Sequence, residues 1–308
     1  MKNKHRLVTR SDMDGLVCAV LLKHLDIIEN IEFVHPKDMQ DGKIQIGSND
    51  ITTNLPYVEG VGLAFDHHHS ETLRVGKKDN HIIDPEAPSA ARVLYNYYRQ
   101  KADFPDSFLP MLEAVDKSDS ANFTIEEIMN PEGWVLLSFL MDARTGLGRF
   151  KDFRVSNYNL MMDLVDYCKN HTIDEILNLP DVRDRVNLFE SYIPMFKTQI
   201  ERCSTVHNNL VVLDLRKEAT IFPGNRFVIY ALFPQANISI HILWGKDQKN
   251  TVFATGKSIF NKTSKTSIGE LMLKYGGGGH DATGTCQVEN EKADMVLKEL
   301  VEKINSDG

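Results

Sequence analysis

The stretch HRLVTRSDMDGLVCAVLLKHL, residues 5–25, decides the fold of this chain. Its first six residues predict a short β-strand, which the polar residues 11–15 bring to an end. The apolar run at 16–22 predicts a helix that is buried on most of its sides. A strand, a short polar turn and a buried helix in this order begin a βα unit, so we expect a parallel sheet.

The rest of the chain first extends this pattern and then changes it. Further strands are expected at 31–35, 50–54 and 61–65, a helix at 88–101, and an almost wholly helical region from 107 to about 207. Beyond that region, strands are expected at 209–215, 226–233, 238–244 and 252–260, with helices at 267–275 and from about 291. The sequence therefore predicts the α/β class, with a doubly wound, mainly parallel sheet, a helical connector and a smaller mixed α/β domain.

Composition and charge exclude several classes of protein. At 308 residues, with 42% hydrophobic and 25% charged residues, the chain is long enough for two domains and is not of a disordered type. We find no apolar run of the roughly 18 residues that a membrane helix needs, no secretory signal and no paired cysteine spacing, so we expect a cytoplasmic protein without a membrane partner. The net charge of −8 argues against binding long duplexes and against a processive exonuclease.

Two carboxylates follow the first predicted strand. Asp12 and Asp14, in Asp-Met-Asp-Gly, stand where the crevice above a parallel sheet collects ligands, so both are candidate metal ligands. The alternative is a capped helix start, at which aspartate is common. An EF-hand loop is disfavoured, because the motif follows a strand and lacks the later acidic residues of that loop.

Two more polar clusters follow apolar segments. The run 66–69, Asp-His-His-His, comes directly after a predicted strand and offers carboxylate and imidazole ligands that suit a divalent ion such as Mn²⁺. A solvated loop is the alternative. The run 116–119, Asp-Lys-Ser-Asp, follows an apolar helix and offers two further carboxylates, with an exposed helix end as the alternative.

A glycine run in the last third is the candidate phosphate site. Residues 276–279 are four glycines, and His280 follows them. Backbone N–H groups of glycine can approach phosphate oxygens closely, and a histidine can donate to them, whereas the alternative is a flexible turn. The segment 144–149, Arg-Thr-Gly-Leu-Gly-Arg, could bind an anion or cap a helix, and Lys257 is a further candidate.

In this order, the motifs SDMDG, FDHHHS, AVDKSD and GGGGHDATGT resemble those of the DHH phosphoesterase family, which includes RecJ-like and exopolyphosphatase-related proteins. The resemblance spans almost the whole chain. It implies a metal-binding phosphoesterase domain at 1–125, a helical connector at 126–205 and a substrate-binding domain at 206–308, with the active site in the cleft.

The resemblance also implies a role for each candidate residue. The expected metal ligands are Asp12, Asp14, Asp66, His67 and Asp116, with Asp119 as the competitor of Asp116. The expected catalytic residues are Asp14, His67 and His68. The substrate's phosphate is expected to contact His68, Gly277, Gly278, Gly279 and His280.

Two positions depart from the family's pattern. Many members have a histidine shortly before the first aspartate, where this chain has Val8, Thr9 and Arg10. Asn54, in Thr-Asn-Leu-Pro, stands where members carry an aspartate. Both changes remove a ligand or a negative charge, so we expect one or two bound ions, and Arg10 could contact a phosphate instead.

These observations favour a Mn²⁺-dependent phosphohydrolase that activates water with its metal, with Mg²⁺ or Co²⁺ as substitutes. The expected substrate is a small phosphorylated nucleotide or a short single-stranded oligonucleotide, such as an oligoribonucleotide, a cyclic dinucleotide or adenosine bisphosphate. The alternatives are a non-catalytic nucleotide-binding protein with an eroded metal site and an exopolyphosphatase-like enzyme. A homodimer is compatible with the sequence.

Overall fold

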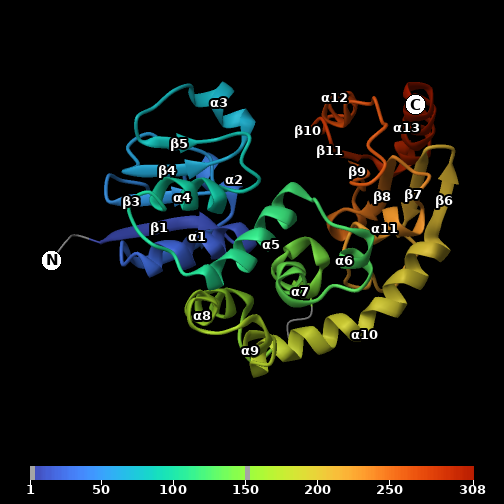
Figure 1. Ribbon diagram of the computed structural model, residues 1–308. Coiled ribbons are helices and arrows are strands. Elements are labelled where there is room, and N and C mark those ends of the chain that lie inside the picture. The colour runs from blue at the N-terminus through green and yellow to red at the C-terminus, as the bar shows by residue number, and fades with distance from the viewer. Residues whose placement is uncertain (1–3, 150–152) are drawn as a thin grey trace. The chain divides into compact units, whose positions relative to one another are not determined.

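The computed structural model describes residues 4–149 and 153–308 (Figure 1). The chain forms two compact units, unit 1 at Met1–Leu188 and unit 2 at Phe189–Gly308. The division falls inside the helix α10, Pro180–Cys203. The three-part division expected at 125/126 and 205/206 stays a prediction. Within the described residues, every helix is too short or too polar to cross a lipid bilayer.

Unit 1 is built on a five-stranded parallel sheet, as the sequence predicts. The strands lie in the order β2-β1-β3-β4-β5, and every neighbouring pair is parallel. Their bounds are β1 His5–Arg10, β2 Ile28–Val34, β3 Asp50–Thr53, β4 Leu63–Asp66 and β5 His81–Ile83. The chain order reverses between β1 and β3, and ligands of such sheets collect at the carboxyl ends of the strands beside this reversal.

Helices and loops cover both faces of this sheet. On one face α1 (Met13–His24) lies along β1 and contacts α4 (Ala90–Tyr98), α5 (Leu109–Ser120) and α8 (Asn157–Asn170) (Figure 1). Because protein surrounds it, α1 is buried from Met13 to Leu22 and has no polar stripe. The other face packs Val8 and Val34 against Met39 of α2 (Pro36–Gln40). The remaining helices of unit 1 are α3 His69–Val75, α6 Ile125–Met129, α7 Gly133–Met141 and α9 Ile173–Leu177.

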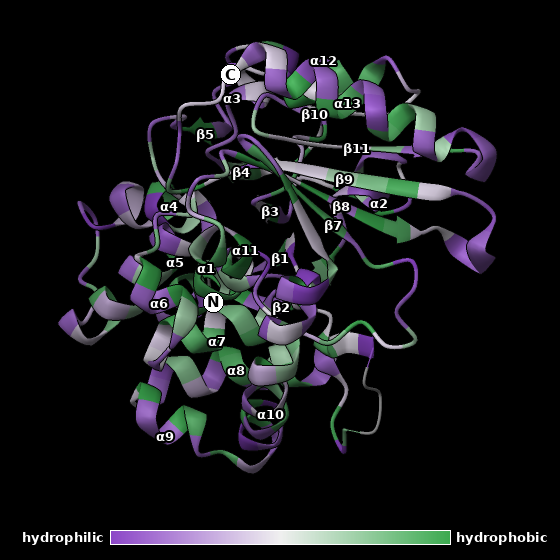
Figure 2. Cartoon of the chain, turned by 90° about the vertical axis from the view of Figure 1, so that its right-hand side faces the viewer, coloured by the Kyte–Doolittle hydropathy of each residue, from purple (hydrophilic) through white to green (hydrophobic). Residues whose placement is uncertain are grey.

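Unit 2 contains a six-stranded mixed sheet in the order β10-β11-β9-β8-β7-β6. The strands are β6 Ser204–His207, β7 Leu210–Asp214, β8 Ile238–Trp244, β9 Thr251–Lys257, β10 Gly278–His280 and β11 Thr283–Val288. Only β7 and β8 pair in parallel among them. The helices α12 (Ile268–Leu273) and α13 (Ala293–Asp307) complete its core, in which Ile240, Phe253 and Leu300 are fully buried. Figure 2 shows the hydrophobic colour along β7 and β8.

Two expectations for this half of the chain are wrong, and the structure places the glycine run in a hairpin. The segment 226–233 contains the helix α11, Val228–Leu232, because β7 and β8 are parallel and the chain must cross over between them. Its apolar pattern reflects burial rather than a strand. The helical region ends at Cys203, and β6 follows it. The residues after His280 form a turn and β11, so the glycine run is one strand of a hairpin.

The turn between β1 and α1 is tight, and Gly15 makes it so. A Cβ at Gly15 would lie 1.9 Å from the carbonyl oxygen of Arg10 and 2.7 Å from Oγ1 of Thr9. The first turn of α1 therefore packs directly on the end of β1. This contact fixes where Asp12 and Asp14 lie relative to the sheet.

Gly15→Ala should lower the free energy of unfolding by about 1–3 kcal/mol, because the added methyl group forces β1 and α1 apart. Gly47→Ala is the matched control, since a Cβ there meets no atom within 4 Å. Its unfolding free energy should change by less than about 0.5 kcal/mol. Urea unfolding of both variants measures the difference, and equal stabilities would contradict the tight turn.

Candidate metal centre

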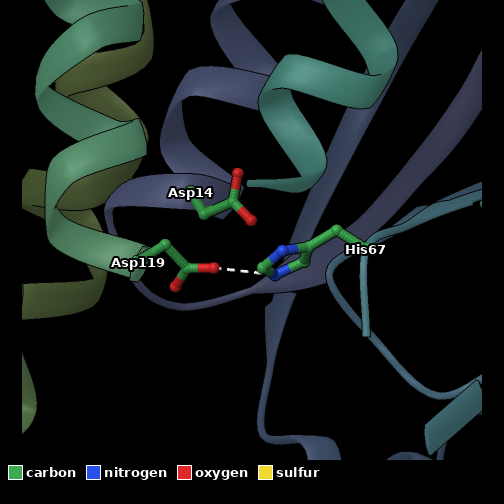
Figure 3. Close-up of side chains that lie close together, drawn as sticks. All are labelled: Asp14, His67 and Asp119. Carbon is green, nitrogen blue, oxygen red and sulfur yellow. Dashed lines mark ion pairs between the residues drawn. The ribbon is translucent and has the colours of Figure 1, made fainter. Parts of the chain in front are cut away.

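Three side chains from separate parts of unit 1 converge at the carboxyl edge of the sheet. Asp14 lies in the first turn of α1, His67 follows β4, and Asp119 lies in the last turn of α5. One ligand atom of each lies within 4.8 Å of the others (Figure 3). His67 Nε2 is 2.7 Å from Asp119 Oδ2. These three residues could hold a divalent cation.

Asp14 is buried, and the start of α4 holds its carboxylate. Oδ2 accepts a hydrogen bond from the Ala90 amide at 2.9 Å, and Oδ1 accepts one from the Ala91 amide at 2.7 Å. These N–H groups have no partner inside their own helix, and the positive end of a helix favours a carboxylate. Burial nevertheless raises the pKa of Asp14, and the charges of Asp119 and Asp12 raise it further. A bound cation would relieve this repulsion.

The ring of His67 is oriented as in metal-binding histidines. Its Nδ1 lies 3.2 Å from the carbonyl oxygen of Ala87, so Nδ1–H donates there and Nε2 faces the carboxylates. The approach of Nε2 to Asp119 is not aligned as a hydrogen bond, and Nε2 has no hydrogen-bond partner among the described residues. Burial lowers the pKa of His67, but the contact with Asp119 and the charge of Asp14 outweigh it and raise the pKa. Nε2 is thus the atom that could exchange a proton for a metal.

Asp12 caps α1 and is joined to Asn54. Its Oδ1 accepts a hydrogen bond from the Gly15 amide at 3.0 Å, so the helix-capping alternative holds for Asp12. Asn54 Nδ2 donates to Asp12 Oδ1 at 3.2 Å, and Arg10 Nε lies 2.8 Å from Asp12 Oδ2. Burial raises the pKa of Asp12, partly offset by the charge of Arg10. Asn54 Oδ1 is buried without a partner among the described residues.

Asp66 shapes the turn that presents His67. Its Oδ1 accepts hydrogen bonds from the backbone amides of His67 at 2.8 Å and His68 at 3.3 Å, and lies 2.6 Å from His68 Nδ1. The bond to Asp66 raises the pKa of His68. Asp66 Oδ2 is buried and lacks a partner within the part of the chain described. Together with Asn54 Oδ1 and His67 Nε2, this is the third such atom in this region, and buried polar atoms normally have partners. The donor set therefore fits a metal ion.

Asp116 is not brought into the group of Asp14 and His67. Its Oδ1 accepts a hydrogen bond from Ser89 Oγ at 2.7 Å, and its Oδ2 accepts one from Arg92 Nε at 2.8 Å. Ser89 also caps α4 by accepting from the Arg92 amide. Asp116 thus ties α5 to α4, and Asp119, nearly one helical turn later, reaches the group. Sequence reasoning placed Asp116 first and Asp119 as its competitor, and it missed the backbone groups of Ala87, Ala90 and Ala91.

In unit 2 the predicted phosphate residues gather at one end of the sheet. His280 of β10 pairs with Thr283 of β11, which in turn pairs with Gly256 of β9. His280 is exposed. Lys257 follows Gly256 in β9, and its Nζ lies 2.7 Å from Asp281 Oδ2.

The glycines of this hairpin serve different purposes. A Cβ at Gly277 would lie 2.1 Å from the carbonyl oxygen of Thr285, and one at Gly279 would lie 2.2 Å from that of Thr283. Strand packing therefore requires both. At Gly278 a Cβ would meet only Leu273, at 3.8 Å, so the fold does not demand this glycine.

Comparisons with known proteins find a close relative among the solved structures. The structure of the pGpG-specific phosphodiesterase PggH from Vibrio cholerae is 60% identical to this chain, covers 99% of this chain and 100% of its own, and has a TM-score of 0.91. RecJ from Thermus thermophilus in complex with Mg²⁺ is 13% identical over 98% of this chain and 50% of its own, with a TM-score of 0.46. No family model and no curated protein matches the chain.

Asp119→Asn should weaken Mn²⁺ binding by about 10- to 150-fold, the loss of one charged contact of about 1.5–3 kcal/mol. Asp116→Asn should weaken it less and instead lower the melting temperature, because Arg92 loses its carboxylate partner. Calorimetric Mn²⁺ titrations and thermal unfolding of both variants test this. A larger loss of Mn²⁺ affinity in Asp116→Asn would contradict the geometry.

Proposed function

This chain belongs to the DHH phosphoesterase family, and from that premise we propose that it is a metal-dependent phosphodiesterase that hydrolyses pGpG to two molecules of GMP. The observation that carries the proposal is the group of Asp14, His67 and Asp119, which offers two carboxylates and one imidazole at the carboxyl edge of a parallel sheet. Identity of 60% to a pGpG-specific phosphodiesterase over the whole chain supports the choice of substrate.

The metal is Mn²⁺, with Mg²⁺ or Co²⁺ as substitutes, because mixed oxygen and imidazole ligands suit these ions. Asp14, His67 and Asp119 would hold it directly. The unpartnered Oδ2 of Asp66 supports this residue as a further ligand. The charge of Asp12 raises the pKa of Asp14, so Asp12 lies close to it. A bound divalent cation lowers the pKa of its water and neutralises charge on the phosphoryl oxygens.

The residues around the proposed ligands hold those side chains in place and orient them. The amides of α4 fix the carboxylate of Asp14, and the carbonyl of Ala87 fixes the ring of His67. His68 is fixed at Nδ1 by Asp66 and is partly exposed, so its Nε2 is left to contact the phosphate that reacts. Pre-positioned groups of this kind lower the barrier because they need no reorganisation during the reaction.

The hairpin of unit 2 is proposed to bind the substrate through its phosphodiester group. His280 is exposed at the end of β10, and the space beside Gly278 leaves its backbone open to a ligand. Lys257 adds a positive charge at the same end of the sheet. A guanidinium, an imidazole or an ammonium group that binds phosphate forms charge-assisted hydrogen bonds, which are stronger than neutral ones.

A second function is supported by one observation. Asn54 places an amide beside Asp12, where a carboxylate would attract a divalent ion more strongly. A nucleotide-binding protein with an eroded metal site would bind pGpG without hydrolysing it. Chromatography of the products with and without Mn²⁺ separates the two functions.

With Mn²⁺, the purified protein should convert pGpG to GMP, and EDTA should abolish the reaction. Asp119→Asn should lower kcat by about 100-fold or more, since it removes charge at the reacting centre. Asp119 is a better site for this test than Asp14, both of whose oxygens accept amide hydrogen bonds. Glu113→Gln, at an exposed position of the same helix, is the control and should keep full activity. Turnover that survives Asp119→Asn would refute the proposed centre.

His280→Ala and Gly278→Ala should both raise KM for pGpG and leave the affinity for Mn²⁺ unchanged. Loss of a charged hydrogen bond predicts an increase of about 10- to 150-fold for His280→Ala. Gly278→Ala should fold normally, because its methyl group meets only Leu273. Steady-state kinetics and Mn²⁺ titrations measure both effects, and an unchanged KM in both variants would remove the hairpin from the substrate site.

A further inference from the structure

Two arginines stand beside the carboxylates of unit 1, and each is fixed by one edge of its guanidinium. Arg10, the last residue of β1, has its Nε 2.8 Å from Asp12 Oδ2. Arg144, in the short turn after α7, has its Nε 2.7 Å from Asp142 Oδ1. In residues 4–149 and 153–308, the terminal Nη groups of both arginines donate no hydrogen bond.

Both guanidinium groups act on the candidate metal centre. The charges of Arg10 and of Arg144 each lower the pKa of Asp12, against the larger effect of its burial. The pKa of Arg144 is lowered by burial but raised on balance by Asp142, Asp12 and Asp119. Arg10 lies at the edge of the sheet that carries the candidate ligands, 2.8 Å from Asp12, and the charge of Arg144 acts on the same carboxylate.

The turn that carries Arg144 is built to hold this side chain. Asp142 accepts a hydrogen bond from the Arg144 amide at 2.9 Å and also binds its Nε, so one carboxylate fixes both the backbone and the guanidinium. Gly146, with φ of +84°, ends the turn in the left-handed region that glycine favours. The side chain of Arg144 stays 57% exposed, and that of Arg10 stays 35% exposed, so a ligand can reach both.

We propose that Arg10 and Arg144 bind the terminal 5′-phosphate of the substrate, the phosphate that is not cleaved, and that they make the enzyme select 5′-phosphorylated dinucleotides. This inference rests on the proposed function. A terminal phosphate carries more charge and more free oxygens than a phosphodiester, and the planar guanidinium can bind two of those oxygens at once. Nε is occupied in both arginines, so their Nη groups form the binding edge.

Arg10 ends β1, directly before the turn that carries Asp12 and Asp14. An arginine cannot act as a metal ligand at neutral pH, because it remains protonated. Its charge instead favours an anion at the same edge of the sheet, and Arg144 supplies a second positive charge from a different loop.

The test compares pGpG with GpG, which lacks only the terminal phosphate. Binding is measured by calorimetry with Ca²⁺ in place of the catalytic ion. The wild-type protein should bind pGpG more tightly than GpG. Arg144→Gln should weaken pGpG binding by about 10- to 150-fold and leave GpG binding unchanged. Arg144→Lys keeps the positive charge but loses the planar guanidinium that can bind two oxygens at once. Its affinity for pGpG should lie between that of the wild-type protein and that of Arg144→Gln.

Arg10→Lys should reduce the preference for pGpG in the same direction, and Arg99→Gln, an exposed arginine of α4's C-terminal end, is the control that should not change it. In steady-state kinetics with Mn²⁺, Arg144→Gln should raise KM for pGpG while kcat stays the same. If the arginine had only a structural role, its substitution would weaken the binding of pGpG and of GpG alike.

The outcomes separate this inference from the proposed function. Equal binding of pGpG and GpG by the wild-type protein, or an equal loss of both in Arg144→Gln, overturns the role of the arginines even if pGpG is hydrolysed. A preference for pGpG that Arg144→Gln removes supports it even if the wild-type protein hydrolyses neither compound, and in that case only the proposed function fails.

Discussion

The two hydrogen bonds from the amides of Ala90 and Ala91 to Asp14 are the constraint on which the rest of the site depends. They join the turn after β1 to the start of α4. Through Ser89 and Arg92, α4 then holds Asp116 and thereby α5, which brings Asp119 to His67. The close contact at Gly15 fixes the other end of this chain of interactions. Each candidate ligand is therefore positioned by backbone that is itself held in place.

Electrostatics explains why so many charges gather at one edge of the sheet. Burial and mutual repulsion raise the pKa values of Asp12 and Asp14, which is unfavourable unless positive charge is near. A divalent cation would supply that charge inside the group, and Arg10 supplies part of it from outside. With a cation bound, the same edge of the sheet would attract a phosphate. Metal binding and recognition of an anionic substrate thus arise from one arrangement of charges.

The sequence predicted the parallel sheet, and it predicted that Asp14 and His67 lie at the ends of its strands, because both residues follow strand patterns that are local and periodic. The choice between Asp116 and Asp119 was not predictable. It depends on the rotation of α5 against α4, which is set by Arg92, a residue 24 positions away along the chain. The strand expected at 226–233 failed because burial in a crossover gives the same apolar pattern as a strand. The backbone amides that hold Asp14 could not be predicted, because every residue except proline has such an amide.

The central claim is that His67 Nε2 is a metal ligand beside Asp14 and Asp119. Pulsed electron paramagnetic resonance on the Mn²⁺-loaded protein, with ¹⁵N-labelled histidine, tests it most directly, since it detects nitrogen bound to the ion. The account predicts coupling to an imidazole nitrogen that is lost in His67→Gln, a variant that keeps a polar side chain at this position. Coupling that persists in His67→Gln, or no nitrogen coupling in the wild-type protein, would contradict it.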